Sequence, residues 1–421
     1  MKKPGFCKEE TLRKIEGGIT APRGFEAAGV HCGIKKMDPD LALIYSSHSA
    51  VACGMFTSNK VKGAPIRVSL RTLRNRQAQA IVVNSGNANT CTGKRGIKDA
   101  QEMARAAAGE LGISGDEVLV ASTGVIGKPL PLSKIAEGIG KARQSLSAQG
   151  GGEAAHAILT TDTTTKEISV ETGIAGRGKK KVKLGGMCKG AGMISPNLAT
   201  MLCFVTTDAC ISPDALQEAI HSATGKSFNQ ISVDGDMSTN DTLLVLANGL
   251  AGNKRIKTWH KKKKRKVKDE NFDIFSQALD FVLIHLAKLI VTDGEGATKL
   301  IEVKVNGAPF PQDARRIARA IANSTLVKTA LAGASPNWGR VMAALGAAHT
   351  KINPDKVDIY FDNLAVVRRG EGAGAKEETL REVLKKKEIM ITVDLNQGKN
   401  STTFWGCDLT EKYVRINKSY L

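Results

Sequence analysis

The chain has 421 residues, of which 42% are hydrophobic, 4% aromatic and 24% charged, and its formal net charge is +20. This length is enough for a large core, in two or three domains or in one large two-layer fold. Residues 1–10 lack the apolar segment of a secretory signal, and we see no apolar run of membrane-spanning length, so we expect no membrane partner.

Apolar periodicity and turn residues predict short strands alternating with medium helices. In chain order, the predicted strands cover residues 80–84, 117–121, 202–206, 243–246, 357–361 and 389–393. The predicted helices cover residues 99–111, 213–224, 272–290 and 312–331. Because strands and helices occur in mixed order, the pattern favours an α/β fold of layered mixed sheets over a strict βαβ repeat.

A strongly basic segment interrupts this pattern. Ten Lys or Arg residues lie at 254–268, in a loop expected at about residues 252–270, and they account for half of the net charge. A charge of this kind is typical of nucleic-acid-binding proteins. Beyond Trp259, however, no aromatic side chain accompanies the basic run 261–266, so base stacking has little support. We interpret the segment as a solvated loop and expect no nucleic-acid partner.

Two short motifs resemble nucleotide-binding loops. Gly225-Lys226-Ser227 matches the end of a phosphate-binding loop, but that loop requires glycine where Ile220 stands. Residues 370–375 fit the GxGxxA pattern without the context of a ribose-binding site. We interpret both motifs as turns and expect no nucleotide cofactor.

Cysteine, histidine and aspartate positions argue against a metal site. The eight cysteines form no CxxC pair, and none of the seven histidines lies in a zinc-ligand spacing. Asp234 and Asp236 are close in sequence, but nothing beside them supplies the other oxygen ligands of a calcium loop. We interpret residues 234–241 as a hydrogen-bonded turn that shapes a pocket, and expect reduced thiols in a cytoplasmic protein without metal.

The segment 189–202 is the most unusual part of the chain. A glycine-rich stretch leads to the Pro196-Asn197 turn and then to Ala199 and Thr200, which opens an apolar strand. A hydroxyl directly after a strained bond can attack the preceding carbonyl, and hydrolysis of the resulting ester frees a new N-terminus. The freed α-amine, with an ordinary pKa of roughly 7.7–8.0, is suited to act as a general base. Taken alone, an Ala-Thr step before a strand is commonplace.

The surrounding motifs give this step its weight. From about residue 17 to the C-terminus, the chain resembles in collinear order the ornithine acetyltransferase family, also called the bifunctional glutamate N-acetyltransferase family. The matching blocks are residues 18–25, 27–30, 84–89, 122–127, 160–163, 189–202, 233–242, 293–298 and 335–340. The resemblance implies a self-processing fold of the N-terminal-nucleophile type, cut into an α chain 1–199 and a β chain 200–421.

The resemblance also implies a reaction of arginine biosynthesis. Thr200 would take the acetyl group from N-acetylornithine, ornithine would leave, and glutamate would accept the acetyl group from the enzyme. Thr123 and Gly124 match the oxyanion hole of the family, where a hydroxyl and a backbone N–H meet the charge on the carbonyl oxygen. The sequence leaves open whether acetyl-CoA is also a donor.

Further positions match substrate contacts of the family: Thr160, Lys189, Thr200 itself, Glu295 and Asn417. Lys189 is suited to a substrate carboxylate and Glu295 to an ammonium group, but which end of ornithine each one faces does not follow. The family has a Thr or Ser five residues beyond Asn417, and this sequence ends four residues beyond it. We therefore expect one wall of the pocket to differ.

The resemblance further implies that the α and β fragments associate as a heterotetramer of two α and two β chains. Two other classes of function remain open. An amide hydrolase with the same self-cleaving threonine would release acetate without an acceptor. A basic nucleic-acid-binding protein would bind with an affinity that falls steeply with salt.

Overall fold

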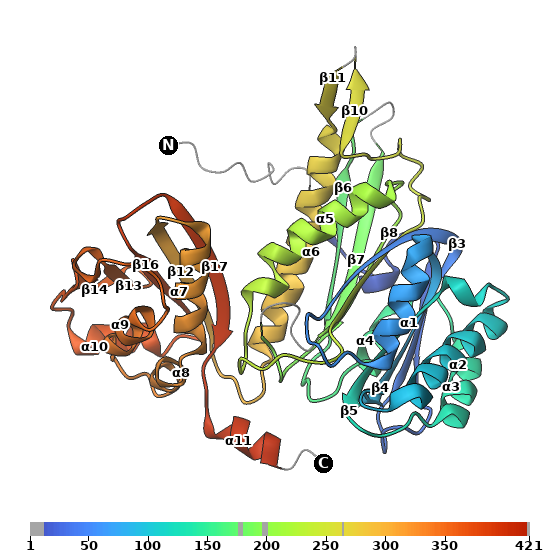
Figure 1. Cartoon of the computed structure of the whole chain (residues 1–421), viewed down its shortest axis with the longest axis horizontal. Coiled ribbons are helices and arrows are strands. Elements are labelled where there is room, and N and C mark those ends of the chain that lie inside the picture. Colours follow the sequence, from blue (N-terminus) through green and yellow to red (C-terminus); the bar gives the residue numbers. More distant parts are fainter. Residues whose placement is uncertain (1–11, 176–179, 196–200, 263–264, 419–421) are drawn as a thin grey trace. The chain divides into compact units, whose positions relative to one another are not determined.

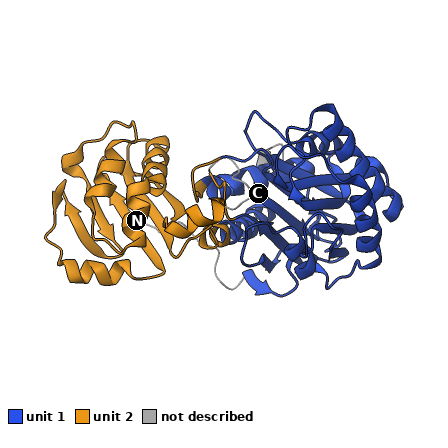
Figure 2. Ribbon diagram, turned by 90° about the horizontal axis from the view of Figure 1, so that it is seen from below, with its two compact units in different colours: residues 1–190, 197–229, 237–287 blue, residues 191–196, 230–236, 288–421 orange. Residues whose placement is uncertain are grey.

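The computed structural model describes residues 12–175, 180–195, 201–262 and 265–418 (Figure 1). It divides into two compact units (Figure 2). Unit 1 comprises residues 1–190, 197–229 and 237–287, and unit 2 comprises residues 191–196, 230–236 and 288–421. Each unit combines a mixed sheet with helices, which confirms the α/β layered class. Unit 1 takes residues from both sides of position 200, so the units differ from the expected α and β chains.

Unit 1 is built on one nine-stranded sheet, with the order β1-β6-β7-β8-β9-β3-β4-β5 and with β2 on β3. Its strands are β1 (Leu12–Ile15), β2 (Phe25–Val30), β3 (Leu41–Phe56), β4 (Gln77–Asn87), β5 (Val118–Val125), β6 (Lys166–Gly173), β7 (Lys181–Lys189), β8 (Leu202–Thr207) and β9 (Thr242–Ala247). The pairs β4–β5 and β8–β9 are parallel, whereas β7 runs antiparallel to β8.

The long strand β3 connects two halves of this sheet. Its first part pairs with β2 and β4, its last part pairs with β9, and the register shifts between Tyr45 and Ala50. A shift of this kind bends a strand. One core then holds Ile81 and Leu119 from one half together with Phe204 from the other. The two halves therefore pack face to face.

Helices cover the outer faces of the two halves (Figure 1). The helices α1 (Ala64–Thr72), α2 (Gly93–Leu111) and α3 (Leu132–Gln144) share a core with β4 and β5. The short α4 (Gly151–Ala157) belongs to the core between the halves. On the other side, α5 (Pro213–Lys226) contacts β3, and α6 (Glu270–Thr292) lies against β7.

Helix α6 corrects one expectation from the sequence. It is long and apolar enough to cross a membrane by length and composition, with a mean hydropathy of 1.7 over its most apolar window. Its Val282 and Leu286 contact Gly186 of β7, and Cys188 of the same strand donates to the Leu286 carbonyl at 3.7 Å. The apolar face of this helix thus packs in the interior of unit 1, as the core helices of folded domains do.

Unit 2 has a six-stranded sheet with the order β15-β14-β13-β16-β12-β17. Its elements are β12 (Leu300–Ala308), α7 (Pro311–Asn323), α8 (Thr325–Ala332), α9 (Gly339–Gly346), β13 (Asp358–Phe361), β14 (Leu364–Arg368), β15 (Glu371–Gly372), α10 (Glu377–Leu384), β16 (Glu388–Asp394), β17 (Asn400–Cys407) and α11 (Glu411–Lys418). Helix α7 packs on β12 and β17, and its Ile317 and Ile321 enter the core of the unit.

All the predicted strands and helices overlap observed ones, but three interpretations were wrong. The helix expected at 312–331 is two helices, because Ser324 ends α7 and accepts a hydrogen bond from Val327 N–H as the cap of α8. Gly225 and Lys226 form the last turn of α5 instead of a separate turn. The basic segment contains a β-hairpin of β10 (Trp259–Lys262) and β11 (Arg265–Lys268). In the GxGxxA-like motif of residues 370–375, the predicted turn is present at Gly370 and leads into β15.

Candidate functional site

Two of the expected site residues meet at strand ends in unit 1. Thr123 lies near the end of β5 and Lys189 ends β7, and both side chains are buried, with 5% and 3% exposed. The Lys189 ammonium donates to Thr123 Oγ1 at 3.5 Å. Because the lysine is the donor, the hydroxyl proton of Thr123 stays available for an oxygen that gains negative charge.

Gly124 fits its place only as glycine. Its φ is +128°, and a Cβ atom there would lie 2.3 Å from the carbonyl carbon of Gly86 and 2.5 Å from the nitrogen of Asn87. The neighbouring turn is fixed by polar side chains: Asn84 Nδ2 donates to the Asn87 carbonyl at 2.8 Å, and the Ser122 hydroxyl donates to Asn84 Oδ1 at 2.6 Å. The backbone beside Thr123 is therefore held rigidly.

A buried carboxylate connects the other expected residues of unit 1. Asp162 accepts hydrogen bonds from Thr160 N–H at 3.1 Å, from Gly190 N–H at 2.6 Å and from Lys166 Nζ at 2.7 Å. Its side chain is 0% exposed and lies 3.9 Å from Lys189 Nζ. Burial by itself raises the pKa of Asp162, but the charges of Lys189 and Lys166, together with the hydrogen bonds from Lys166 and Gly190, outweigh it and lower the pKa to about 2.

Asp162 lies in the family-like block 160–163, but no role was predicted for it. Its position between Thr160 and the lysines became informative only once the chain had folded, because Gly190 and Asp162 are 28 residues apart. In the sequence alone, Asp162 stands out as a carboxylate four residues before Lys166, in a stretch with few other charges. An ion pair at this spacing is ordinarily a surface pair, so the pattern did not single it out.

The chain just after the expected cleavage point is anchored by a second buried carboxylate. Met201 N–H donates to Asp241 Oδ1 at 3.2 Å, and Thr242 N–H donates to the Met201 carbonyl at 3.0 Å. Ala199 and Thr200, the expected scissile pair, lie outside the described residues. Met201 is the first described residue after them, and 1% of it is exposed.

In unit 2, Glu295 and Asn417, two of the residues predicted to contact substrate, contact each other. Asn417 Nδ2 donates to Glu295 Oε2 at 2.8 Å, and Glu295 N–H donates to the Ala191 carbonyl at 2.8 Å. Gly192 makes room for this carboxylate, because a Cβ atom at Gly192 would lie 2.4 Å from Glu295 Cδ. The glycine-rich stretch after Lys189 thus supplies both a backbone acceptor and the space that Glu295 occupies.

The Asp234 carboxylate holds a turn, as predicted. It accepts hydrogen bonds from Met193 N–H at 2.6 Å, Ile194 N–H at 2.9 Å and Asp236 N–H at 3.1 Å, and from the Tyr413 hydroxyl at 3.3 Å. Burial raises the pKa of Asp234, and these backbone donors oppose the rise. Among the described residues, no group of three or more His, Cys, Asp or Glu side chains is arranged to hold a metal ion.

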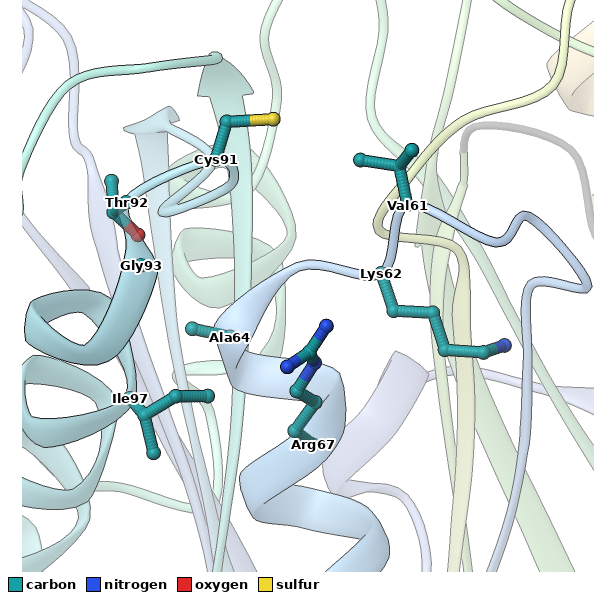
Figure 3. Close-up of a pocket in the computed structure, with 8 residues that line it drawn as sticks. All are labelled: Val61, Lys62, Ala64, Arg67, Cys91, Thr92, Gly93 and Ile97. Carbon is teal, nitrogen blue, oxygen red and sulfur yellow. The ribbon is translucent and has the colours of Figure 1, made fainter.

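A separate surface cavity of about 250 Å³ lies in unit 1, between the start of α1 and the start of α2 (Figure 3). Its lining residues are Val61, Lys62, Ala64, Arg67, Cys91, Thr92, Gly93 and Ile97. The side chains of Lys62 and Arg67 come from the α1 side, and Cys91 and Ile97 from the α2 side. None of the site residues expected from the sequence lines this cavity.

Comparisons with known proteins agree with the motifs. The ArgJ family model matches residues 26–421. The arginine biosynthesis bifunctional protein ArgJ of Symbiobacterium thermophilum is 49% identical, covering 96% of this chain and 99% of its own length. That of Bacillus licheniformis is 46% identical and covers 98% of each chain.

Two solved structures are also similar in sequence. The ArgJ structure from Bacillus halodurans is 42% identical and covers 52% of this chain and 98% of its own, with a TM-score of 0.48. The structure of ornithine acetyltransferase complexed with ornithine, from Mycobacterium tuberculosis, is 37% identical and covers 46% of this chain and 100% of its own, with a TM-score of 0.40.

Proposed function

This chain belongs to the ArgJ family and is an acetyltransferase of arginine biosynthesis, and from that premise we propose that it transfers acetyl groups through an ester on Thr200. The donor is N-acetylornithine, the acceptor is glutamate, and the products are ornithine and N-acetylglutamate. The observation that supports this most directly is the contact of Lys189 with Thr123. It places a cation that can bind the substrate carboxylate beside a hydroxyl that can stabilise the oxyanion.

The enzyme first cuts itself. The Thr200 hydroxyl attacks the Ala199 carbonyl, the peptide nitrogen leaves, and water hydrolyses the ester to give an Ala199 carboxylate and a free α-amine on Thr200. Two hydrogen bonds support this assignment, one from Met201 N–H to the Asp241 side chain and one from Thr242 N–H to the Met201 carbonyl, because they hold the residue that follows the nucleophile in one position. The resulting chains are 1–199 and 200–421.

Acetyl transfer follows in two balanced steps. The Thr200 amine takes the hydroxyl proton while the oxygen attacks the acetyl carbon, and the ornithine α-amine leaves with a proton. The α-amine of glutamate then attacks the acetyl ester, and the Thr200 oxygen regains its proton. In both steps the carbonyl oxygen gains negative charge, which the Thr123 hydroxyl and the Gly124 N–H stabilise.

Charge complementarity supports the proposed substrate contacts. Lys189 binds the α-carboxylate that N-acetylornithine and glutamate share. Thr160 is linked to Lys189 through Asp162, which accepts a hydrogen bond from Thr160 N–H and lies 3.9 Å from Lys189 Nζ. The side-chain ammonium is the only cationic group of N-acetylornithine, and Glu295 with its partner Asn417 offers a carboxylate for it. Glutamate has no side-chain ammonium, so its binding would use the contact with Lys189 and not the contact with Glu295.

A second proposed activity is the acetylation of glutamate by acetyl-CoA, because the relatives are named bifunctional. The same acetyl ester on Thr200 would form from a thioester, with the thiolate of coenzyme A leaving. We further propose that the mature enzyme is a cytoplasmic heterotetramer of two α and two β chains and that it needs no metal or bound cofactor.

Trapping the ester tests the main proposal. With N-acetylornithine alone, intact mass spectrometry should show the 200–421 fragment heavier by one acetyl group, and initial rates should give parallel double-reciprocal lines. Thr123→Ala should lower kcat by about 10²-fold, as loss of one oxyanion donor does. Intersecting lines without an acetylated fragment would contradict the ester. Acetate released at the full rate without glutamate would identify an amide hydrolase instead.

A further inference from the structure

The loop of residues 31–40, which connects β2 to β3, is folded around one buried carboxylate. Four consecutive backbone N–H groups donate to the side chain of Asp40: those of Cys32 (2.7 Å), Gly33 (3.1 Å), Ile34 (2.6 Å) and Lys35 (2.9 Å). Burial by itself raises the pKa of Asp40, but hydrogen bonds from this loop outweigh it and lower the pKa. The backbone from which the Lys35 side chain starts is therefore held in one position.

The ammonium group of Lys35 joins this loop to the segment that carries Thr160. Lys35 Nζ donates to the Pro39 carbonyl at 2.9 Å and to the Leu159 carbonyl at 2.7 Å. The Leu159 carbonyl and the Thr160 N–H are the two polar groups of one peptide unit, and Asp162 accepts from that N–H at 3.1 Å. A cation thus holds the oxygen of this peptide unit and an anion holds its nitrogen. The unit cannot rotate without breaking a charged hydrogen bond.

The stem of Lys35 packs at the strand end that carries Gly124. A Cβ atom at Gly86 would lie 3.3 Å from Lys35 Cγ, and Gly86 pairs with Gly124 in the parallel ladder of β4 and β5. Burial lowers the pKa of Lys35, the charge of Lys189 lowers it further, and nearby carboxylates, including that of Asp162, oppose the change. Lys35 therefore lies close enough to Lys189 and Asp162 to interact with both charges.

We propose that Lys35 is a positioning residue for the substrate contact of Thr160: it fixes the Leu159–Thr160 peptide unit and, through it, the direction of the Thr160 side chain. This inference rests on the proposed function, in which Thr160 contacts the substrate. Two of the three N–H bonds of the Lys35 ammonium are used by carbonyls of the chain itself, so Lys35 acts through Thr160. The affinity for substrate then depends on Lys35, while the rate of acetyl transfer from bound substrate does not.

Lys35→Met removes the ammonium group and keeps an unbranched side chain that can pack at Gly86. We expect the KM for N-acetylornithine to rise about tenfold, the order expected for one hydrogen bond to a charged group, with kcat within about threefold of the wild type. Lys35→Arg retains a donor for the Leu159 carbonyl and should bring the KM back to within about threefold. A lysine that only stabilised the fold would change the free energy of unfolding and leave the KM unchanged, which would overturn the inference.

Lys134→Met is the matched control. Lys134, in the first turn of α3, donates to the Gly33 carbonyl at 2.7 Å, so it binds the same loop through a bond of the same length. That bond ends in the loop and not on the Leu159–Thr160 peptide unit. The variant should therefore keep both KM and kcat within about twofold. A KM increase as large as that of Lys35→Met would assign the effect to loosening of the loop and would contradict the proposed role.

A double-mutant cycle tests whether Lys35 acts through Thr160. Thr160→Ala removes the side chain that Lys35 is proposed to position, and by itself it should raise the KM for N-acetylornithine about tenfold. Adding Lys35→Met to this variant should change the KM by less than about twofold. A further tenfold rise would mean that Lys35 contributes to binding independently of Thr160, and the positioning role would be wrong.

If Lys35→Met fails to fold, a crystal structure of the wild-type enzyme with bound N-acetylornithine decides. Lys35 Nζ should lie about 3 Å from the Leu159 carbonyl oxygen, with Thr160 in contact with the ligand. A Lys35 ammonium bonded to the ligand instead would make it a binding residue and would exclude the positioning role.

The underlying function fails in a different way. A wild-type enzyme that transfers no acetyl group, or a Thr160→Ala variant with the KM of the wild type, would remove the premise that Thr160 contacts the substrate. An active wild type and a raised KM in Thr160→Ala, together with an unaffected Lys35→Met variant, would remove the inference alone.

Discussion

At the scale of single residues, Gly192 is a sharp test of the role of Glu295. In Gly192→Ala, the new methyl group would meet the Glu295 carboxylate, which must then turn away from Asn417. We expect the KM for N-acetylornithine to rise about tenfold, the cost of one hydrogen bond to a charged group, with a smaller effect on kcat. Steady-state kinetics in both directions measures this.

Gly109→Ala provides the control for Gly192→Ala. A Cβ atom at Gly109, within α2, would meet no atom of the rest of the protein within 4 Å beyond its chain neighbours and its own helix backbone. Its kinetics should match the wild type, and its stability should rise slightly because alanine favours a helix. An unchanged KM in Gly192→Ala would mean that Glu295 does not hold the donor.

Asp162 links the site to stability. Its pKa is about 2 in the folded protein, below the ordinary 3.8, so its ionised form stabilises the fold. That contribution is complete above about pH 4 and is lost as the pH falls toward 2. In Asp162→Asn, buried Lys166 loses its carboxylate, and we expect the free energy of unfolding to fall by about 3–5 kcal/mol near neutral pH.

Urea unfolding in the uncut Thr200→Ala background measures this effect on a single chain. The difference in stability between the parent and its Asp162→Asn variant should shrink between pH 4 and pH 2, as the carboxylate of the parent becomes protonated. The control is Glu137→Gln, which breaks the exposed pair with Lys141 on α3 and should leave stability unchanged. Equal stability of Asp162→Asn and its parent would show that the buried pair is not stabilising.

At the scale of elements, the basic hairpin β10–β11 is predicted to be dispensable for acetyl transfer. It forms a two-stranded sheet of its own, apart from the nine-stranded sheet that carries Thr123 and Lys189. Replacing residues 261–266 with a Gly/Ser linker should leave kcat/KM within a few-fold of the wild type. Activity assays at one fixed ionic strength measure this, because the substitution removes six positive charges. A loss of a hundredfold or more would place the hairpin in the site.

Which elements were predictable follows from their apolar patterns. The buried strands β4, β5, β8 and β9 each contain a run of at least four apolar residues. Helix α5 begins at a Ser-Pro-Asp signal whose Ser212 caps it. Strand β3 was missed because the polar residues 46–49 stand at its bend and divide its apolar pattern. The hairpin was missed because its strands have no apolar face to reveal a period of two.

The residues of the candidate site likewise divide into those that the sequence predicts and those that it does not. The motifs predict Thr123, Gly124, Lys189, Glu295 and Asn417 as site residues, and the structure brings Thr123 to Lys189 and Asn417 to Glu295. The roles of Asp162 and Asp241 were not predictable, because each depends on a backbone N–H supplied by a distant part of the chain. Periodicity reports which face of an element is buried and carries no information about such partners.

At the scale of the whole molecule, we predict that the two fragments stay together after cleavage. Strand β7 of the first fragment pairs with β8 of the second from Leu184↔Thr207 to Lys189↔Leu202, and β3 pairs with β9 in the same sheet. Separating the fragments would expose these strands and the core between them. A denaturing gel should show two bands, while native mass spectrometry should show fragments 1–199 and 200–421 in one particle.

The matching variant is Thr200→Ala, which should run as a single band of the full chain and assemble in the same way. N-terminal sequencing of the wild-type fragment that lacks Met1 should begin at Thr200. A different first residue would move the nucleophile, and fragments that separate under native conditions while staying active would contradict the shared sheet.

The placement of β9 between β8 and β3 also has a consequence for the timing of synthesis. A ribosome must pass residue 247 before β9 can join the two halves of the sheet, and it must pass α6 before β7 is covered. A nascent chain severed before that point would release its first 199 residues with nothing to hold them. Because the backbone around Met201 depends on residues 241 and 242, we expect the proposed cut to wait until the segment that retains both pieces has been translated.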